Sequence, residues 1–515
     1  MLPSARMPRP PSATSRKRRQ TGAVLGTFAV LVSARTARAY NTEIDATASA
    51  QYYTLSSPFG DSPELRRRRY TSTLGMSLYD LTGDSIPTHP ALSFRSRLRL
   101  DADLGQDPAE RDPHSNRFVP GLEQAPFDLQ YAYLEGERYL DGALGFRLGR
   151  QYVADVLGWW SFDGAEVTLA APKYLTLEAY GGFEQRSGLP LLGTSRFEAQ
   201  GVARGSRDDL RQNQWTGYLE ESKLAPAVGV ALETSDLGWV HARVTYRRVI
   251  NRDSVVVSPF LDPSGQLRTY SADRVSTEKV GASLRLSPFS FGSLSGSVVY
   301  DFYAGLVSNQ ALGLDVFPTG RLTLGADYER VVPTFDGDSV FNWFAHSAIT
   351  TFKGRADWAV SRRFDAALGF GSRLFETLGD PATYANAPNQ EVVTRAVDPF
   401  GTLGGRYRHG SGSLSLRGQA ETGERGHRVG ADVTSQELWK NGYYDSLVVL
   451  SLYDFADDLR PERYATSFTY VLGFGVRPNA LGTRSRFGVE WEQSMNRLVG
   501  QRYRLLATLD LSVFR

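Results

Sequence analysis

Hydrophobic and polar positions alternate along many short stretches of this chain, and residues 91–100 show the pattern most clearly. Four of the five even-numbered positions there are apolar, namely Leu92, Phe94, Leu98 and Leu100. The odd-numbered positions include three arginines, Arg95, Arg97 and Arg99. A period of two is that of a β-strand whose faces meet different surroundings. Three arginines cannot face a dry interior, because unpaired guanidinium groups would lose their hydration. The pattern predicts one face toward lipid and one toward water.

The same alternation recurs over almost the whole chain after residue 40. We predict strands over 46–55, 70–79, 91–100, 129–136, 143–153, 162–170, 173–183, 227–234, 239–250, 275–286, 293–303, 311–317, 321–331, 347–360, 364–375, 401–408, 413–421, 427–433, 444–455, 464–476, 486–495 and 502–514. Strands that meet lipid on one face must close into a barrel, because an open edge would leave backbone groups without partners. The fold class is therefore all-β: a transmembrane antiparallel up-and-down barrel of about 18–22 strands, even in number, with no plug domain.

Short connections alternate with long ones, as in bacterial outer-membrane barrels, which have short turns on the periplasmic side and long loops outside. The long loops are expected over 104–126 and for about forty residues before Leu224. The four arginines of 66–69 are expected in the first loop. A solvated charge run is the favoured interpretation of them, and pairing with lipid phosphates is the alternative.

The first 39 residues have the features of a secretory signal peptide. A basic cluster at 16–19 precedes an apolar run from Gly22 to Val32, and the small residues Ala37 and Ala39 then precede a cleavage site near Tyr40. The apolar run is shorter than the ~20 residues of a membrane-spanning helix, although a retained anchor helix is the alternative. We therefore assign residues 1–39 to a leader and residues 40–515 to one barrel domain exported to the outer membrane.

Removing the leader changes the charge of the chain. The whole sequence has a formal net charge of +2, but the leader holds eight basic residues and no acidic ones, which leaves 50 basic against 56 acidic residues and a net charge of −6. Nothing in this balance favours nucleic acid as a partner. Outer-membrane lipids are the partners that the barrel pattern predicts.

Candidate chemistry is sparse. The chain has no cysteine, which excludes disulfides and thiolate chemistry. Its six histidines lie far apart, at His89, His114, His241, His346, His409 and His427. No pair has the spacing of a metal site, no stretch suggests a Ser–His catalytic pair, and the glycine-rich stretch 401–405 lacks a following phosphate-binding Lys-Ser/Thr. We predict no cofactor, no metal and no enzymatic activity; hydrolysis of lipid or ester is the least favoured alternative.

The predicted inward face carries many basic residues. The expected pore-lining positions are Arg95, Arg97, Arg99, Arg147, Arg243, Arg247, Arg285, Lys353, Arg355, Arg373, Arg406, Arg408 and Arg417. Fixed positive charge along a channel attracts anions and repels cations. Acidic residues share this parity, namely Glu178, Asp327, Glu329, Glu490 and Glu492. A charge-balanced lumen with little selectivity is therefore the alternative to an anion-selective one.

Two short motifs carry a resemblance to a known family. The segment 146–151 reads Phe-Arg-Leu-Gly-Arg-Gln, and the segment 159–165 reads Trp-Trp-Ser-Phe-Asp-Gly-Ala. Together they resemble large single-chain outer-membrane porins of the alginate-export type, in which a Gly-Arg-Gln strand end precedes a Phe-Asp-Gly strand start. The resemblance covers about twenty residues. It implies a pore that passes an anionic polysaccharide outward together with periplasmic export proteins, and it makes Arg147 and Arg150 candidates for the channel wall.

The leading function is therefore an outer-membrane channel for anionic solutes or for a secreted polysaccharide. A general diffusion porin without selectivity is one alternative. A structural or adhesive barrel with a closed lumen is another, and measured conductance distinguishes it from both channels. A plugged iron transporter is disfavoured, because strand-like sequence begins within a few residues of the leader.

Overall fold

The structure of the protein is a computed structural model. It describes residues 41–55, 65–82, 89–103, 127–171, 174–185, 225–235, 237–261, 267–334, 348–378, 392–423, 426–457, 464–478, 484–496 and 500–514. The predicted leader and the predicted long loops at 104–126 and 186–224 lie outside these residues. Within the described ranges there is no helix with the length and hydropathy that crossing a membrane requires.

The described residues form 22 strands. In chain order these are β1 (Asn41–Leu55), β2 (Leu65–Tyr79), β3 (Ala91–Asp103), β4 (Phe127–Tyr139), β5 (Leu144–Asp155), β6 (Gly158–Ala171), β7 (Leu175–Glu184), β8 (Pro226–Thr234), β9 (Val240–Leu261), β10 (Leu267–Phe289), β11 (Gly292–Asp301), β12 (Leu306–Thr319), β13 (Leu322–Val331), β14 (Ile349–Ala359), β15 (Phe364–Leu378), β16 (Val392–His409), β17 (Gly412–Gly423), β18 (Gly426–Trp439), β19 (Tyr444–Asp457), β20 (Tyr464–Val476), β21 (Arg484–Asn496) and β22 (Gly500–Phe514).

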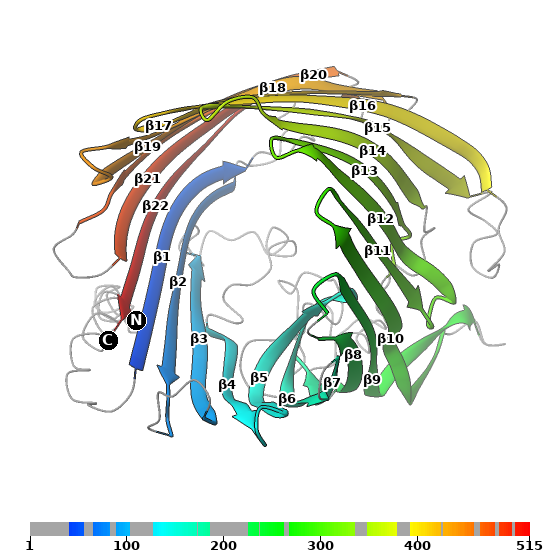
Figure 1. Ribbon diagram of the computed structural model, residues 1–515. Helices are drawn as coiled ribbons and strands as arrows, with labels where there is room; N and C mark the ends of the chain where they lie inside the picture. The colour runs from blue at the N-terminus through cyan, green and yellow to red at the C-terminus, as the bar shows by residue number, and fades with distance from the viewer. Residues whose placement is uncertain are drawn as a thin grey trace, which may run out of the picture. The chain divides into compact units, whose positions relative to one another are not determined.

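Each strand pairs antiparallel with its neighbours in sequence, and β1 pairs with β22, as Figure 1 shows for the blue and red ends of the chain. The β1–β22 register runs from Glu43 opposite Phe514 to Tyr53 opposite Arg504. This pairing closes the sheet and satisfies the backbone of both terminal strands. The predicted fold class, a closed all-β barrel with an even number of strands, is confirmed.

Several strands are longer than the alternation predicts. β9 continues to Leu261, β10 begins at Leu267, and β16 begins at Val392. The arginines at 66–69, which we expected in a loop, belong to β2, so that expectation was wrong. Backbone pairing between strands requires no apolar side chains, so a hairpin can extend beyond the region where hydrophobic alternation is needed.

One face of the wall is apolar and exposed. Leu368, Leu403 and Leu416 on three successive strands are 50, 64 and 53 % exposed. Soluble proteins rarely expose so large a continuous apolar surface, whereas a barrel in a bilayer covers it with lipid. This face is the outward one, and the opposite parity faces the interior of the barrel.

The two ends of the barrel differ in their connections. We call the end with the connections 140–143, 290–291, 320–321, 360–363 and 410–411 the turn rim, because these links have two to four residues. The other end, which includes the connections after β3 and β7, is the loop rim. The connections of 104–126 and before Leu224 are at the loop rim, but the connections 156–157 and 302–305 at the same rim are as short as those of the turn rim, so the predicted alternation holds only in part.

Candidate functional site

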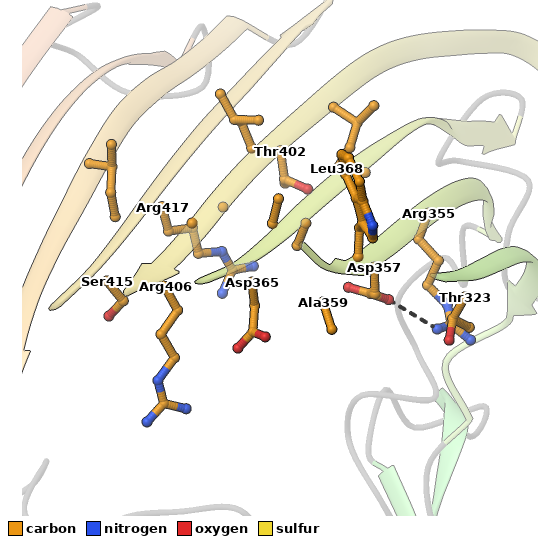
Figure 2. Close-up of a pocket in the computed structure, with 18 of the residues that line it drawn as sticks. Thr323, Arg355, Asp357, Ala359, Asp365, Leu368, Thr402, Arg406, Ser415 and Arg417 are labelled. Carbon is orange, nitrogen blue, oxygen red and sulfur yellow. Dashed lines mark hydrogen bonds and ion pairs between the residues drawn. The ribbon is translucent and has the colours of Figure 1, made fainter. Parts of the chain in front are cut away.

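All thirteen predicted pore-lining positions have the inward parity. Arg355, for example, is opposite Gly325 on β13 and Gly369 on β15. The next residue, Ala356, is opposite the outward-facing Leu368, so Arg355 faces inward. Figure 2 shows the same division, with Leu368 projecting to one side of the sheet and Asp365, Arg406 and Arg417 to the other. The inner wall of the barrel is therefore rich in cationic side chains.

Eight of these cations have acidic partners on the inner wall. The pairs are Arg95 with Glu135 (3.1 Å), Arg97 with Asp45 (3.7 Å), Arg147 with Glu135 (2.7 Å) and Glu166 (3.6 Å), Arg243 with Glu233 (2.6 Å) and Glu178 (2.9 Å), Arg247 with Asp155 (3.1 Å), Arg355 with Asp327 (3.3 Å), Asp357 (3.5 Å) and Asp315, Arg373 with Glu421, and Arg408 with Asp365. Arg99 also interacts with neighbouring groups. Much of the wall is thus locally neutral, and its partly exposed pairs contribute little to stability, about 0–1 kcal/mol each.

Three of the five predicted inward acids take part in this pairing. Glu178 binds Arg243, Asp327 binds Arg355, and Glu492 binds Arg504 at 2.6 Å. Glu329 and Glu490 have the same parity. The inner wall is a mixture of charges, as the sequence indicates, and its selectivity depends on where the unpaired charges lie.

Four of the thirteen cations have no acidic partner among the described residues: Arg285, Lys353, Arg406 and Arg417. The last three line one hollow of about 720 Å³ on strands β14 to β17, near the turn rim. Within the described part of the chain, Arg406 donates a hydrogen bond to the Ser413 hydroxyl alone, at 3.4 Å. Arg406 and Arg417 are diagonal neighbours on adjacent strands, because Arg406 is opposite Ser415 and Arg417 is opposite Gly404. Asp432 is opposite Arg417 on β18, but no ion pair joins these two described residues.

Small side chains form the floor of this hollow. The inward residues there are Ala367 and Gly369 on β15 and Thr402 and Gly404 on β16. A Cβ atom at Gly369 would lie 2.5 Å from the Thr402 hydroxyl and 3.8 Å from Lys353 Cε, so the Lys353 chain leans toward this glycine. The residues that line the hollow include six cations, Arg321, Lys353, Arg355, Arg406, Arg408 and Arg417, but only two acids, Asp357 and Asp365. The hollow is therefore a net positive recess in the inner wall.

A second feature of the interior is a flap, which we define as residues 150–163 at the end of the β5–β6 hairpin. Among the described residues, the β4–β5 pairing ends at Arg150, and the β6–β7 pairing ends at Phe162 apart from one bond from the Gln185 N–H to the Ser161 carbonyl at 2.8 Å. Beyond these points the hairpin leaves the wall. The flap tip contacts inward residues of β9 and β10: Asp155 binds Arg247, and Val156 Cγ1 lies 2.5 Å from the position of a Cβ at Gly281. The flap therefore crosses the inner surface of the barrel.

One side of the flap packs tightly against the wall. Trp160 and Phe162 are 7 and 0 % exposed and contact the Tyr180 ring at 5.6 and 5.5 Å between centroids. Val153, Ala225, Ala227 and Val249 complete this cluster, the hydrophobic core found among the described residues. Arg247 lies on the inward face of β9, but it is 4 % exposed and its guanidinium lies over the Trp160 ring at 5.1 Å. The flap covers it, so Arg247 is a wall-packing residue rather than part of the open inner surface.

The two motifs of the family resemblance build the base of this flap. Gly149, Gly164 and Gly182 face one another across β5, β6 and β7. Gly149 has φ +128°, and a Cβ there would lie 2.3 Å from the Ala132 carbonyl oxygen. Only glycine permits this conformation and approach. The glycine row marks the line at which the hairpin bends away from the wall.

An ion pair directly beyond the glycine row holds the bend. Arg150 donates to both carboxylate oxygens of Asp163, from Nε at 2.6 Å and from Nη2 at 2.8 Å, and Nη1 donates to the Leu129 carbonyl at 2.9 Å. The two side chains are buried. Arg150, which the resemblance makes a wall candidate, thus joins β5 and β6 to the edge of β4 and does not line the open interior.

Sequence reasoning did not single out several residues of these sites. Asp155, Tyr152 and Trp159 of the flap and Arg321 of the hollow were not candidates. Arg321 could have been found from its position two residues before Thr323, on the inward parity of β13. The flap residues gave no such signal. Alternation along a strand tells which side chains face the interior only while the strand is part of the barrel wall, and the flap is not. Among the described residues, no three His, Asp or Glu side chains form a cluster that could hold a metal ion.

The sequence matches no protein-family model and no curated protein. Solved structures with a similar arrangement include OccAB4 of Acinetobacter baumannii (8 % identity, TM-score 0.42, covering 92 % of this chain and 98 % of that one) and the outer-membrane protein OpdK from Pseudomonas aeruginosa (8 %, 0.41, 92 % and 99 %). The P pilus usher PapC translocation pore gives similar values (8 %, 0.41, 92 % and 99 %). At these scores the likeness carries no functional argument, so function must be inferred from the residues of this chain.

Proposed function

We propose that this protein is an outer-membrane channel that passes anionic solutes. Its closed wall has an exposed apolar outer face, which a bilayer would cover, and an inner face on which charged side chains concentrate. A lipid-covered exterior combined with a charged interior is the arrangement of a water-filled passage. A channel accounts for this arrangement without any catalytic group.

The observation that carries the anion preference is the recess on β14 to β17. Lys353, Arg406 and Arg417 line it without acidic partners among the described residues. An unpaired cation contributes a net field inside the barrel, whereas a cation beside a carboxylate contributes little beyond its own pair. The recess would therefore concentrate anions near the turn rim even though the chain without its leader is negatively charged overall.

The experiment is a reversal-potential measurement in planar bilayers under a potassium chloride gradient. We expect a potential of the sign that chloride permeation produces. The triple variant K353Q/R406Q/R417Q is expected to lose most of this preference at similar conductance. Its control is the double variant R373Q/E421Q, which removes a cation together with the carboxylate that pairs with it and so leaves the net charge of the wall unchanged. Cation selectivity of the unaltered protein would refute the anion proposal, and the absence of any steady current would favour a closed structural or adhesive barrel.

The specific version of the proposal is export of an anionic polysaccharide, with periplasmic export proteins as partners. Its support is the resemblance of the motifs at 146–151 and 159–165 to alginate-export porins. Structurally, these motifs form the bend and the base of the flap. A strain that lacks this protein but still secretes its polysaccharide would exclude the export version and leave the channel proposal intact.

A further inference from the structure

A row of aromatic rings lies inside the barrel on the side of the flap that does not pack against the wall. Trp159 contacts Tyr152 at 6.2 Å between ring centroids, and Tyr152 contacts Tyr131 at 6.0 Å. Tyr131 in turn contacts Tyr133 at 5.9 Å. The row thus runs without interruption from the flap to strand β4.

The row faces the interior rather than lipid. Tyr131 is opposite Arg97 in the β3–β4 register, and Arg97 binds Asp45 on the inner wall. Tyr152 is in ring contact with Tyr131, and the opposite side of the same hairpin packs on Tyr180 and Arg247, which are also inward residues. The flap therefore has inward-facing groups on both sides, so Tyr152 and Trp159 lie within the barrel.

The two rings of the row that belong to the flap are accessible, unlike the rings that pack the flap against the wall. Trp159 is 69 % exposed and Tyr152 is 41 % exposed, whereas Trp160 and Phe162, which attach the flap, are at most 7 % exposed. An indole ring left largely in water gains most when a ligand with an apolar face covers it. The accessible part of the row is thus a binding surface without an occupant from the described chain.

We propose that Trp159, Tyr152 and Tyr131 form a track that binds linked sugar rings inside the channel. The C–H face of a sugar ring packs on an aromatic ring, while its hydroxyl groups need polar partners at the edge of the contact. Arg97 lies directly across from Tyr131, and Arg147 lies over the Tyr133 ring at 5.9 Å. Several rings in sequence suit a chain of ring-shaped units better than one small aromatic acid, which would occupy a single ring.

This inference rests on the proposed channel, and it deepens that proposal by naming a ligand class and a place. The probes are two sugar hexamers of equal length. Maltohexaose is neutral, whereas a hexamer of galacturonic acid has a carboxylate on every ring. Each is added to single channels in planar bilayers, and the concentration that halves the current is measured.

We expect both sugars to block the unaltered channel. Trp159→Ala and Tyr152→Ala are each expected to raise the half-blocking concentration about tenfold for both sugars (about 1.4 kcal/mol), and Trp159→Phe to retain most of the affinity.

The matched control is Trp358→Ala, which removes an indole of the outward face that is 52 % exposed. It should leave the block unchanged. Failure of both sugars to block the unaltered channel, or block that is unaffected by Trp159→Ala and Tyr152→Ala, would overturn the proposal. If only the galacturonic acid hexamer blocks, and the Trp159→Ala and Tyr152→Ala variants do not weaken that block, then charge rather than ring stacking holds the ligand.

A second measurement separates this proposal from the channel proposal. Binding of maltohexaose to the detergent-solubilised protein is measured by calorimetry, with no current involved. Binding that Trp159→Ala weakens about tenfold would support the aromatic track even if the barrel did not conduct. If the protein conducts with anion preference but binds neither sugar, the channel proposal stands and the proposal of an aromatic sugar-binding track is refuted.

Discussion

Asp155 and Arg247 are 92 residues apart in the sequence, yet the Asp155 carboxylate accepts a hydrogen bond from the Arg247 guanidinium at 3.1 Å inside the barrel. Their side chains are 0 and 5 % exposed. The pair joins the tip of the β5–β6 hairpin to the inner face of β9. Because it is buried, removing one partner leaves an uncompensated charge, which costs on the order of 3–5 kcal/mol.

We expect Asp155→Asn to loosen the flap. Without the carboxylate the Arg247 charge is unpaired under the flap, so the flap should detach for part of the time. Single-channel recordings should then show higher mean conductance and more current noise than the unaltered protein. Glu492→Gln is the control, because this inner-wall carboxylate pairs with Arg504 and belongs neither to the flap nor to the recess. Identical conductance and noise in Asp155→Asn and in the unaltered protein would argue against a flap held by this pair.

A disulfide can test the position of the flap tip. Val156 Cγ1 lies 2.5 Å from the place of a Cβ at Gly281, so cysteines at these two positions should bring their sulfur atoms within bonding range. Since the chain has no cysteine of its own, V156C/G281C can form only this intramolecular bond. We expect complete cross-linking under mild oxidation, read from mass change after thiol labelling. Full labelling of both cysteines after oxidation would place the tip elsewhere.

Arg150→Met should destabilise the barrel markedly. The variant removes both hydrogen bonds from Arg150 to the buried Asp163 carboxylate and the bond to the Leu129 carbonyl. We expect a loss of about 3–5 kcal/mol, measured as a lower temperature for the heat-induced shift in gel mobility. The double variant R150M/D163L should recover part of this loss, because no charge is then left buried. Arg408→Met, which breaks an exposed pair with Asp365, is the control and should shift the midpoint little.

The fold could be predicted largely from period-two alternation, because a closed barrel imposes one rule on every strand. The β20 bounds, Tyr464–Val476, agree with the prediction to the residue. The ends of β9, β10 and β16 could not be predicted in this way. Where a hairpin is paired beyond the region of apolar alternation, only backbone hydrogen bonds hold it, and these depend little on side-chain type.

The candidate site was predictable only in part. Parity placed Lys353, Arg406 and Arg417 on the inward face, but it could not show which cations have partners. Arg147 is neutralised by Glu135 and Glu166 because the register sets them opposite one another on neighbouring strands. Register between strands is a property of pairing that the alternation within a single strand does not contain. The aromatic row was missed for a related reason, since it forms only where the hairpin bends at Gly149.

The central claim is that alternate residues of each strand face water inside the barrel and lipid outside it. Its most direct test uses the absence of native cysteine. Arg406→Cys and Leu403→Cys, which lie three residues apart on opposite faces of β16, are compared in a lipid bilayer with a charged, membrane-impermeant thiol reagent. We predict that the cysteine at 406 reacts and changes the current while the cysteine at 403 remains unreactive; the reverse pattern would contradict the account.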